Sequence, residues 1–187
     1  MTLGGVIFLA LLALLVIFAI SLYNRLVGLG QRSEEAWSGI DVQLKRRADL
    51  VPNLVETVKG YAAHEQSTLD QVIRARGAAV SATTPETRAR AENQLTDALR
   101  QLFVLAEAYP DLKADANYRE LQQSLSGIEE AIQDSRRYYN AVVRDLNTAV
   151  ESFPSNVVAS LGRFVKRQYF EIDRPEDRHV PQVSFGG

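Results

Sequence analysis

The chain has 187 residues and a formal net charge of −2, with 24% charged and 46% hydrophobic residues. This composition is typical of a folded protein rather than a disordered one, and the lack of a basic excess argues against a nucleic-acid-binding protein. With no Cys, two His and one Met, the sequence offers no disulfide, thiol nucleophile or iron–sulfur cluster. We therefore predict no bound metal and no other cofactor.

The N-terminal segment is apolar and uncharged. Residues 3–22 include no charged side chain, and as a helix they would span about 30 Å, the thickness of the hydrocarbon core of a bilayer. A cleaved signal peptide is the alternative, but no Lys or Arg precedes the segment and Ala19-Ile20-Ser21 is a poor cleavage site. We predict a retained transmembrane anchor. Its representative residues are Leu3, Phe8, Leu12, Leu15, Phe18 and Leu22.

Basic residues follow the anchor and none precedes it. Tyr23 lies where an aromatic interface residue is expected, Arg25 is the first charge, and Arg32 and Lys45 come later. By the positive-inside rule, this asymmetry predicts that the part of the chain after the anchor lies in the cytoplasm.

An apolar heptad pattern begins after the anchor. Its residues alternate in spacing between three and four: Trp37, Ile40, Leu44, Arg47, Val51, Leu54, Val58 and Tyr61. Ser33, followed by two acidic residues, is expected to begin this helix. Gly28 and Gly30 are expected to form a flexible joint before it, and Pro52 is expected to kink or restart it.

Three further helices are predicted. A short Ala-rich helix is expected over roughly residues 64–80. Thr84 and Pro85 have the order of an N-cap and a first-turn proline, and Pro110 ends the helix that they begin. The longest heptad pattern covers residues 118–153.

Short connections make successive helices antiparallel. The predicted fold is therefore all-α: an N-terminal transmembrane helix, then an antiparallel up-and-down four-helix bundle with coiled-coil-like packing, a short C-terminal helix and an extended tail. The predicted divisions are an anchor and joint (residues 1–29), the helical bundle (30–153), and the short helix with the C-terminal tail (154–187).

Polar residues at apolar or clustered positions are candidates for a ligand site. Arg47 occupies an apolar position of its heptad pattern. Its guanidinium is either buried against an acid such as Glu107 or Glu130, or it reaches solvent along its own stem. The candidate polar cluster consists of Arg47, His64, Glu107, Arg136 and Tyr138.

Basic and aromatic residues are interleaved near the C-terminal end. Arg163, Lys166 and Arg167 lie beside Phe164 and Tyr169. Such a segment either contacts an anionic bilayer surface or packs its aromatic residues on the end of a bundle. In an up-and-down bundle it returns toward the membrane. The candidate membrane-surface residues are Arg25, Arg163, Lys166 and Arg167.

Several specific motifs occur in order along the chain. They include Glu35-Ala36-Trp37, Leu50-Val51-Pro52-Asn53-Leu54, Glu107-Ala108-Tyr109-Pro110-Asp111, Ser135-Arg136-Arg137-Tyr138-Tyr139-Asn140 and Phe153-Pro154-Ser155-Asn156. Through them the chain resembles the LemA family from the anchor to about Phe170. The resemblance implies a bacterial protein with one N-terminal transmembrane helix, an antiparallel four-helix bundle and no established enzymatic activity. A magnetosome-membrane protein belongs to that family, which favours membrane organisation over catalysis.

The expected function is that of a membrane-anchored helical interaction or scaffold protein of the bacterial cytoplasmic (inner) membrane, and not of an enzyme. Its expected partners are the lipid bilayer, further copies of itself in a homo-oligomer, and other membrane proteins. Candidate residues for self-association are Val42, Val55, Phe103 and Val104. The alternatives are a ligand-binding domain or enzyme that uses the polar cluster, and an accessory factor of a membrane protease or transporter.

Overall fold

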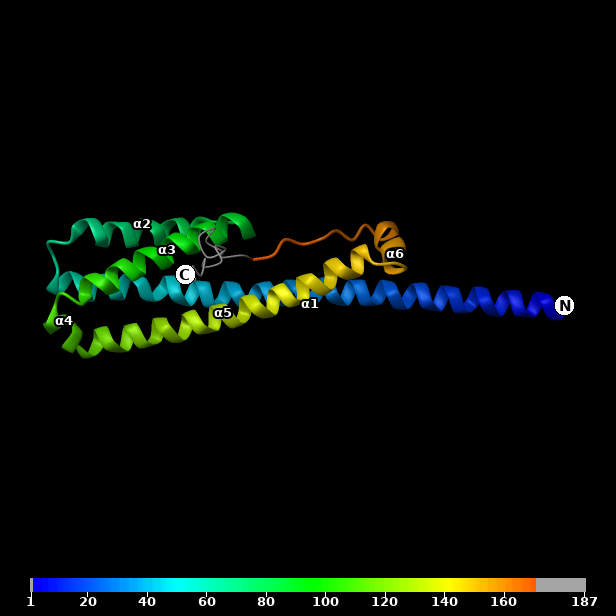
Figure 1. Ribbon diagram of the computed structural model, residues 1–187, viewed down its shortest axis with the longest axis horizontal. Helices are drawn as coiled ribbons and strands as arrows, with labels where there is room; N and C mark the ends of the chain where they lie inside the picture. Colours follow the sequence, from blue (N-terminus) through cyan, green and yellow to red (C-terminus); the bar gives the residue numbers. More distant parts are fainter. Residues whose placement is uncertain (1, 171–187) are drawn as a thin grey trace, which may run out of the picture. The chain divides into compact units, whose positions relative to one another are not determined.

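The computed structural model describes residues 2–170, which contain six α-helices and no strand. The all-α prediction is therefore confirmed for this part of the chain, whereas the predicted tail over residues 171–187 lies outside the described residues. The helices are α1 (Leu3–Tyr61), α2 (Gln66–Ser81), α3 (Pro85–Ala106), α4 (Pro110–Ala114), α5 (Ala116–Glu151) and α6 (Ser155–Leu161) (Figure 1).

Helix α1 is continuous over 59 residues, so the predicted joint at Gly28 and Gly30 is wrong. Both glycines are helical, and Ser33 donates a hydrogen bond to the Gly30 carbonyl at 2.7 Å instead of beginning a new helix. Two glycines weaken a helix by about 1 kcal/mol each. Here Leu26 and Leu29, on either side of Gly28, are buried in a hydrophobic cluster. This packing outweighs the low helix propensity of the glycines.

Helix α1 also continues through Pro52, where a kink or a restart was predicted, so the helix does not restart there. A proline has no N–H, so the carbonyl four residues earlier loses its helical donor. That carbonyl belongs to Ala48, and the Nε of Arg76 from α2 donates to it at 2.6 Å. The side chain of Arg76 therefore replaces the hydrogen bond that Pro52 removes.

The chain forms two compact units. The first consists of Met1–Arg47 and Ser124–Tyr169, and the second includes Ala48–Gln123. Helices α1 and α5 contribute to both units because each crosses a unit boundary.

In the first unit, α1 packs against α5 along their heptad patterns. Ile40 and Leu44 of α1, and Ile128 and Ile132 of α5, are buried as the patterns predicted. Trp37 and Tyr139 meet edge to face, with ring centroids 5.5 Å apart. Trp37 is only half-buried, because its ring lies at the margin of the core.

In the second unit, α2 and α3 lie side by side and run antiparallel after a short connection (Figure 1). Their facing surfaces combine small and large apolar side chains. The buried apolar residues are Leu69, Val72, Ala75 and Ala79 of α2, and Ala89, Ala91, Leu95, Ala98, Leu99, Leu102 and Ala106 of α3.

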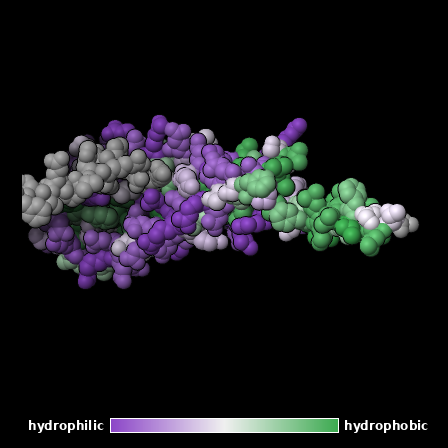
Figure 2. Space-filling model, turned by 45° about the vertical axis from the view of Figure 1, so that its right-hand side comes forward, coloured by the Kyte–Doolittle hydropathy of each residue, from purple (hydrophilic) through white to green (hydrophobic). Residues whose placement is uncertain are grey.

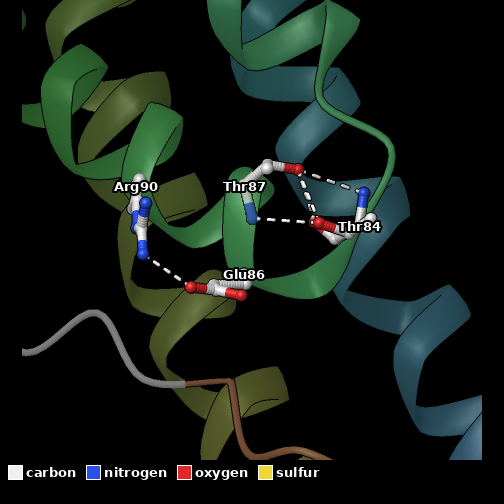
Figure 3. A network of polar contacts seen from close by, with 4 residues as sticks. All are labelled: Thr84, Glu86, Thr87 and Arg90. Atoms are coloured by element: carbon white, nitrogen blue, oxygen red, sulfur yellow. Dashed lines mark hydrogen bonds and ion pairs between the residues drawn. The ribbon is translucent and has the colours of Figure 1, made fainter.

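Side chains satisfy backbone polar groups at the C-terminus of α2 and at the N-terminus of α3. Thr84 is the N-cap of α3, as predicted, and forms a capping box with Thr87 (Figure 3). Glu86 in the first turn pairs with Arg90. The guanidinium of Arg88 donates to two carbonyls near the end of α2, at 3.0 and 3.2 Å. Carbonyls at a helix C-terminus have no donor in the helix itself, so Arg88 closes α2.

We predict that the contribution of Arg76 to stability depends on Pro52. Arg76→Met leaves the Ala48 carbonyl without its side-chain donor and should cost about 1–3 kcal/mol. In a Pro52→Ala background, the new N–H at position 52 can bond that carbonyl, so the same change should cost much less. A double-mutant cycle of urea unfolding on the detergent-solubilised chain measures this coupling. Equal costs in the two backgrounds would contradict the proposed replacement.

Candidate functional site

The N-terminal part of α1 is long and apolar enough to cross a membrane, and its side chains are exposed. Of the predicted anchor residues, only Leu22 is half-buried, and five are exposed: Leu3, Phe8, Leu12, Leu15 and Phe18. Figure 2 shows hydrophobic residues over the N-terminal end and over the surface next to it, whereas most of the remaining coloured surface in that view is polar. The sequence prediction of an apolar helix of membrane-spanning length is confirmed.

Immediately after this apolar part, α1 meets α5 and α6. Leu26 and Leu29 form a buried cluster with Leu146 and Ala149 of α5 and Ala159 of α6. Val150, Val158 and Phe164 pack on the cluster from outside. The Phe164 ring meets the ring of Tyr23 edge to face, with centroids 5.5 Å apart. We call this arrangement the α1–α5–α6 junction.

A tight turn after α6 directs Phe164 back onto α1. The N–H of Phe164 donates to the Ala159 carbonyl, and the N–H of Arg163 donates to the Ser160 carbonyl. This pair of bonds defines a Schellman C-cap, whose left-handed position is usually glycine. Here Arg163 occupies it with φ 55°. At the preceding Gly162, a Cβ would lie 2.6 Å from the Phe164 ring, so the turn has room only for glycine there.

Beyond Phe164 the chain is extended and bonded to α5. The side-chain amide of Asn147 donates to the Arg167 carbonyl at 3.0 Å and accepts from the Arg167 N–H at 2.9 Å. The Tyr139 hydroxyl donates to the Gln168 carbonyl at 3.0 Å. These side chains of α5 supply the partners that a neighbouring strand would supply in a sheet.

The four candidate membrane-surface residues all belong to the first unit. Arg25 and Arg163 are exposed. Lys166 pairs with Glu151 at 2.6 Å, which raises the pKa of its ammonium group, and Arg167 pairs with Glu34 of α1 at 2.7 Å. Two of the four bases therefore take part in ion pairs within the protein, and contact of all four with a membrane stays a prediction.

Arg47 is buried, as one of its two sequence interpretations required. Its side chain is 2% exposed, and its Nη1 lies 2.6 Å from the Oε2 of Glu129 on α5. The acids considered from the sequence were Glu107 and Glu130, but the ion pair in the structure is with Glu129. Glu129 lies between the buried Ile128 and Ile132 in sequence, at the edge of the apolar stripe of α5.

The other members of the predicted polar cluster are distributed between the units. Arg136, half-buried, and Tyr138, exposed, belong to the first unit with Arg47. His64 and Glu107 belong to the second, where His64 is exposed and Glu107 pairs with Lys113. A shared ligand role for the five stays a prediction. Residues 2–170 contain no group of three or more His, Cys, Asp or Glu side chains that could hold a metal ion.

Polar contacts in the second unit include several that the sequence reasoning missed. The hydroxyl of Tyr61 donates to Asp115 at 3.0 Å, and that of Tyr109 donates to Glu65 at 3.2 Å. Asp115 also accepts from the backbone N–H of Tyr118, at 2.9 Å. An Asp directly before a helix is a recognisable N-cap signal. It went unused because the helix was expected to begin two residues later.

Comparison with known proteins gives the relationship of the chain. The LemA family model matches residues 36–185, which is most of the sequence. The chain belongs to the LemA family.

This LemA-family protein is similar to magnetosome proteins and to a protein named LemA. It is 25% identical over 175 residues to Magnetosome protein MamQ 2 of Paramagnetospirillum magneticum, an alignment that covers 80% of this chain and 64% of that protein. It is 25% identical over 189 residues to Magnetosome protein MamQ of Magnetospirillum gryphiswaldense, covering 86% and 70%. It is also 28% identical over 127 residues to Protein LemA of Metamycoplasma hominis, covering 67% and 58%.

The alignment thus spans less than two thirds of MamQ 2 and of the Metamycoplasma protein. None of the names of these relatives refers to an enzymatic activity.

We predict an asymmetric response at the Arg47–Glu129 pair. Glu129 is 37% exposed and can be hydrated after Arg47→Met, whereas the guanidinium of Arg47, 2% exposed, cannot be hydrated after Glu129→Ala. Glu129→Ala should therefore lower the free energy of unfolding by about 1–3 kcal/mol, and Arg47→Met should lower it clearly less. Urea unfolding in detergent compares the two, with Glu130→Ala as the exposed control. The reverse order would show that the pair does not stabilise the buried guanidinium.

We also predict a pH dependence from Asp115. The N–H of Tyr118, and then the hydroxyl of Tyr61, lower the pKa of this carboxyl below its usual value of 3.8. Because the folded-state pKa is lowered, the stabilisation is present above the unfolded pKa and is lost as the pH falls through the folded one.

Asp115→Asn keeps a capping residue at this position, but the new side chain does not titrate. The variant should therefore be less stable than the natural chain near neutral pH, and this difference in stability should shrink on acidification below about pH 4. Thermal unfolding as a function of pH measures this difference, with the exposed Asp111→Asn as the control. A deficit that is independent of pH would contradict the assigned role of Asp115.

Proposed function

We propose that this LemA-family protein is a single-pass scaffold of the bacterial cytoplasmic membrane, with the part after the anchor in the cytoplasm. The observation that carries the proposal is the continuity of α1. One helix contains both the apolar, membrane-length segment and the heptad residues Ile40 and Leu44 that pack on α5. No joint separates anchor and folded part, so the first unit would be held at a fixed height above the bilayer.

A continuous helix of this kind suits a role in membrane organisation better than a role in catalysis. From Leu22 to Arg47, α1 would rise about 37 Å beyond the hydrocarbon core, at about 1.5 Å per residue. We further propose that α1, α2, α3 and α5 form the up-and-down four-helix bundle predicted from their short connections. Several of the hydrogen bonds described above satisfy backbone groups at helix ends or elsewhere in the fold, and this use of polar side chains supports a structural role.

Self-association is part of the proposal, because confinement to a membrane raises the effective concentration of neighbouring copies. Of the four residues expected on an association surface, Val42 and Val104 are exposed and Phe103 is half-buried. Val55 is buried in the core of the second unit and is removed from this set. Val42, on α1, is the better probe because it lies on the same helix as the anchor.

The absence of Cys in the sequence allows a direct test of anchoring and association. Full-length Val42→Cys protein in native membranes should stay in the pellet after alkaline carbonate extraction. It should also give a disulfide-linked dimer on mild oxidation. Arg32→Cys, exposed on another side of the same helix, is the control for random collision.

The Val42→Cys crosslink should exceed that of Arg32→Cys and persist when the membrane is diluted with added lipid. A monomer in nanodiscs, with equal crosslinking at the two positions, would overturn self-association and favour the ligand-binding alternative. Release of the intact chain by carbonate would overturn the anchor itself.

A further inference from the structure

The segment around α6 exposes four large apolar side chains. Leu161 is 82% exposed and Phe153 is 81% exposed, and Val157 and Val165 are exposed as well. These four residues are spaced four apart. Val157 and Leu161 therefore share one face of α6, while Ala159 is buried in the junction and Val158 packs on its cluster.

This apolar surface lies at the place where α1 leaves its apolar segment. Ala159 and Phe164 pack against Leu26 and Tyr23, the first residues of α1 after the membrane-length part. Figure 1 shows α6 beside α1 next to the end of α5. In Figure 2, hydrophobic residues cover the N-terminal helix and also the adjoining surface. The exposed face of α6 is thus continuous with the surface that lipid would cover.

The charge of the segment fits an anionic bilayer surface. Residues 152–165 contain no Asp or Glu, and their single charge is the exposed Arg163. The Schellman turn holds Arg163 between Leu161 and Phe164, so its side chain extends from the same segment as the apolar ones. A long basic side chain beside inserted apolar groups can reach lipid phosphates while its stem stays in the apolar layer.

Single exposed apolar residues are common on soluble proteins, but four on one short segment are expensive to leave in water. Full burial of a Val, Leu or Phe side chain contributes about 1.5–3 kcal/mol. Partial insertion of four of them would therefore supply several kcal/mol. Because α6 packs on α1, the segment already lies beside the membrane-length helix, and no further free energy is needed to bring it to the bilayer.

We propose that α6 and its flanking residues form a second membrane contact. Phe153, Val157, Leu161 and Val165 would insert at the boundary of headgroups and acyl chains, in the leaflet where α1 emerges, and Arg163 would contact lipid phosphates. The inference rests on α1 crossing the membrane as proposed above. Its consequence is that the first unit touches the bilayer at two places, which fixes its rotation about the axis of α1.

Tryptophan fluorescence tests the proposal on the full-length chain. The single natural tryptophan is replaced by Trp37→Phe, and one probe is then introduced by Leu161→Trp. The protein is reconstituted into vesicles of phosphatidylcholine and phosphatidylglycerol that carry bromine near the top of the acyl chains. The probe at position 161 should emit at short wavelength and be quenched by the bromine.

Two matched probes make the outcome specific. The first is Val42→Trp, at an exposed position on a helix of the first unit. Because position 42 lies about 28 Å along α1 from Tyr23, this probe should not be quenched. Phe18→Trp reports insertion of α1 and should be quenched strongly by deeper bromine. Circular dichroism of each variant shows that the helices are retained.

The outcomes separate the two proposals. Quenching at position 18 without quenching at position 161 would overturn the second membrane contact and leave the anchor intact. No quenching at position 18 would overturn the anchor. Short-wavelength emission at position 161 that is unaffected by bromine and weakens on lipid dilution would assign the surface to a second copy of the chain, which also overturns the lipid contact.

Discussion

The carbonyl of Ala48 and the backbone at Gly28 and Gly30 are the weak points of α1, and the rest of the structure depends on how they are held. At Ala48, Arg76 of α2 supplies the donor that Pro52 cannot. At the glycines, the burial of Leu26 and Leu29 compensates for low helix propensity. In each case tertiary contact rather than local sequence keeps the helix continuous, and this continuity joins the apolar N-terminal segment to the part of α1 that packs on α5.

Several polar side chains are partners of the backbone in the structure. Arg88 closes the end of α2, Asp115 caps α5, and Asn147 bonds the extended segment after α6. A buried carbonyl or N–H without a partner costs about 1–3 kcal/mol, so each of these contacts is worth retaining for stability alone. This use of polar side chains is consistent with a structural role.

The sequence predicted features that depend on local chemistry or on long periodicity. The apolar length of residues 3–22, the cap at Thr84 and the buried Ile128 and Ile132 all follow from spacing within one segment. Prediction from the sequence failed where a residue distant in the chain determines the local structure. The continuation of α1 past Pro52 depends on Arg76 of α2, and the ion-pair partner of Arg47 is Glu129 of α5 rather than Glu107 or Glu130. Neither is visible from the helix that contains the proline or the arginine.

The unbroken α1 also sets an angular relation within the first unit. Each residue of a helix turns the chain by about 100° and advances it by about 1.5 Å. One residue added between Leu22 and Leu26 would therefore turn the apolar N-terminal segment by more than a quarter of a circle relative to the face that packs on α5. Seven added residues would nearly restore the phase, with a deviation of about 20° and a longer helix. The number of residues between Leu22 and Leu26 thus determines which side of the apolar segment points in the same direction as the face of α1 that packs on α5.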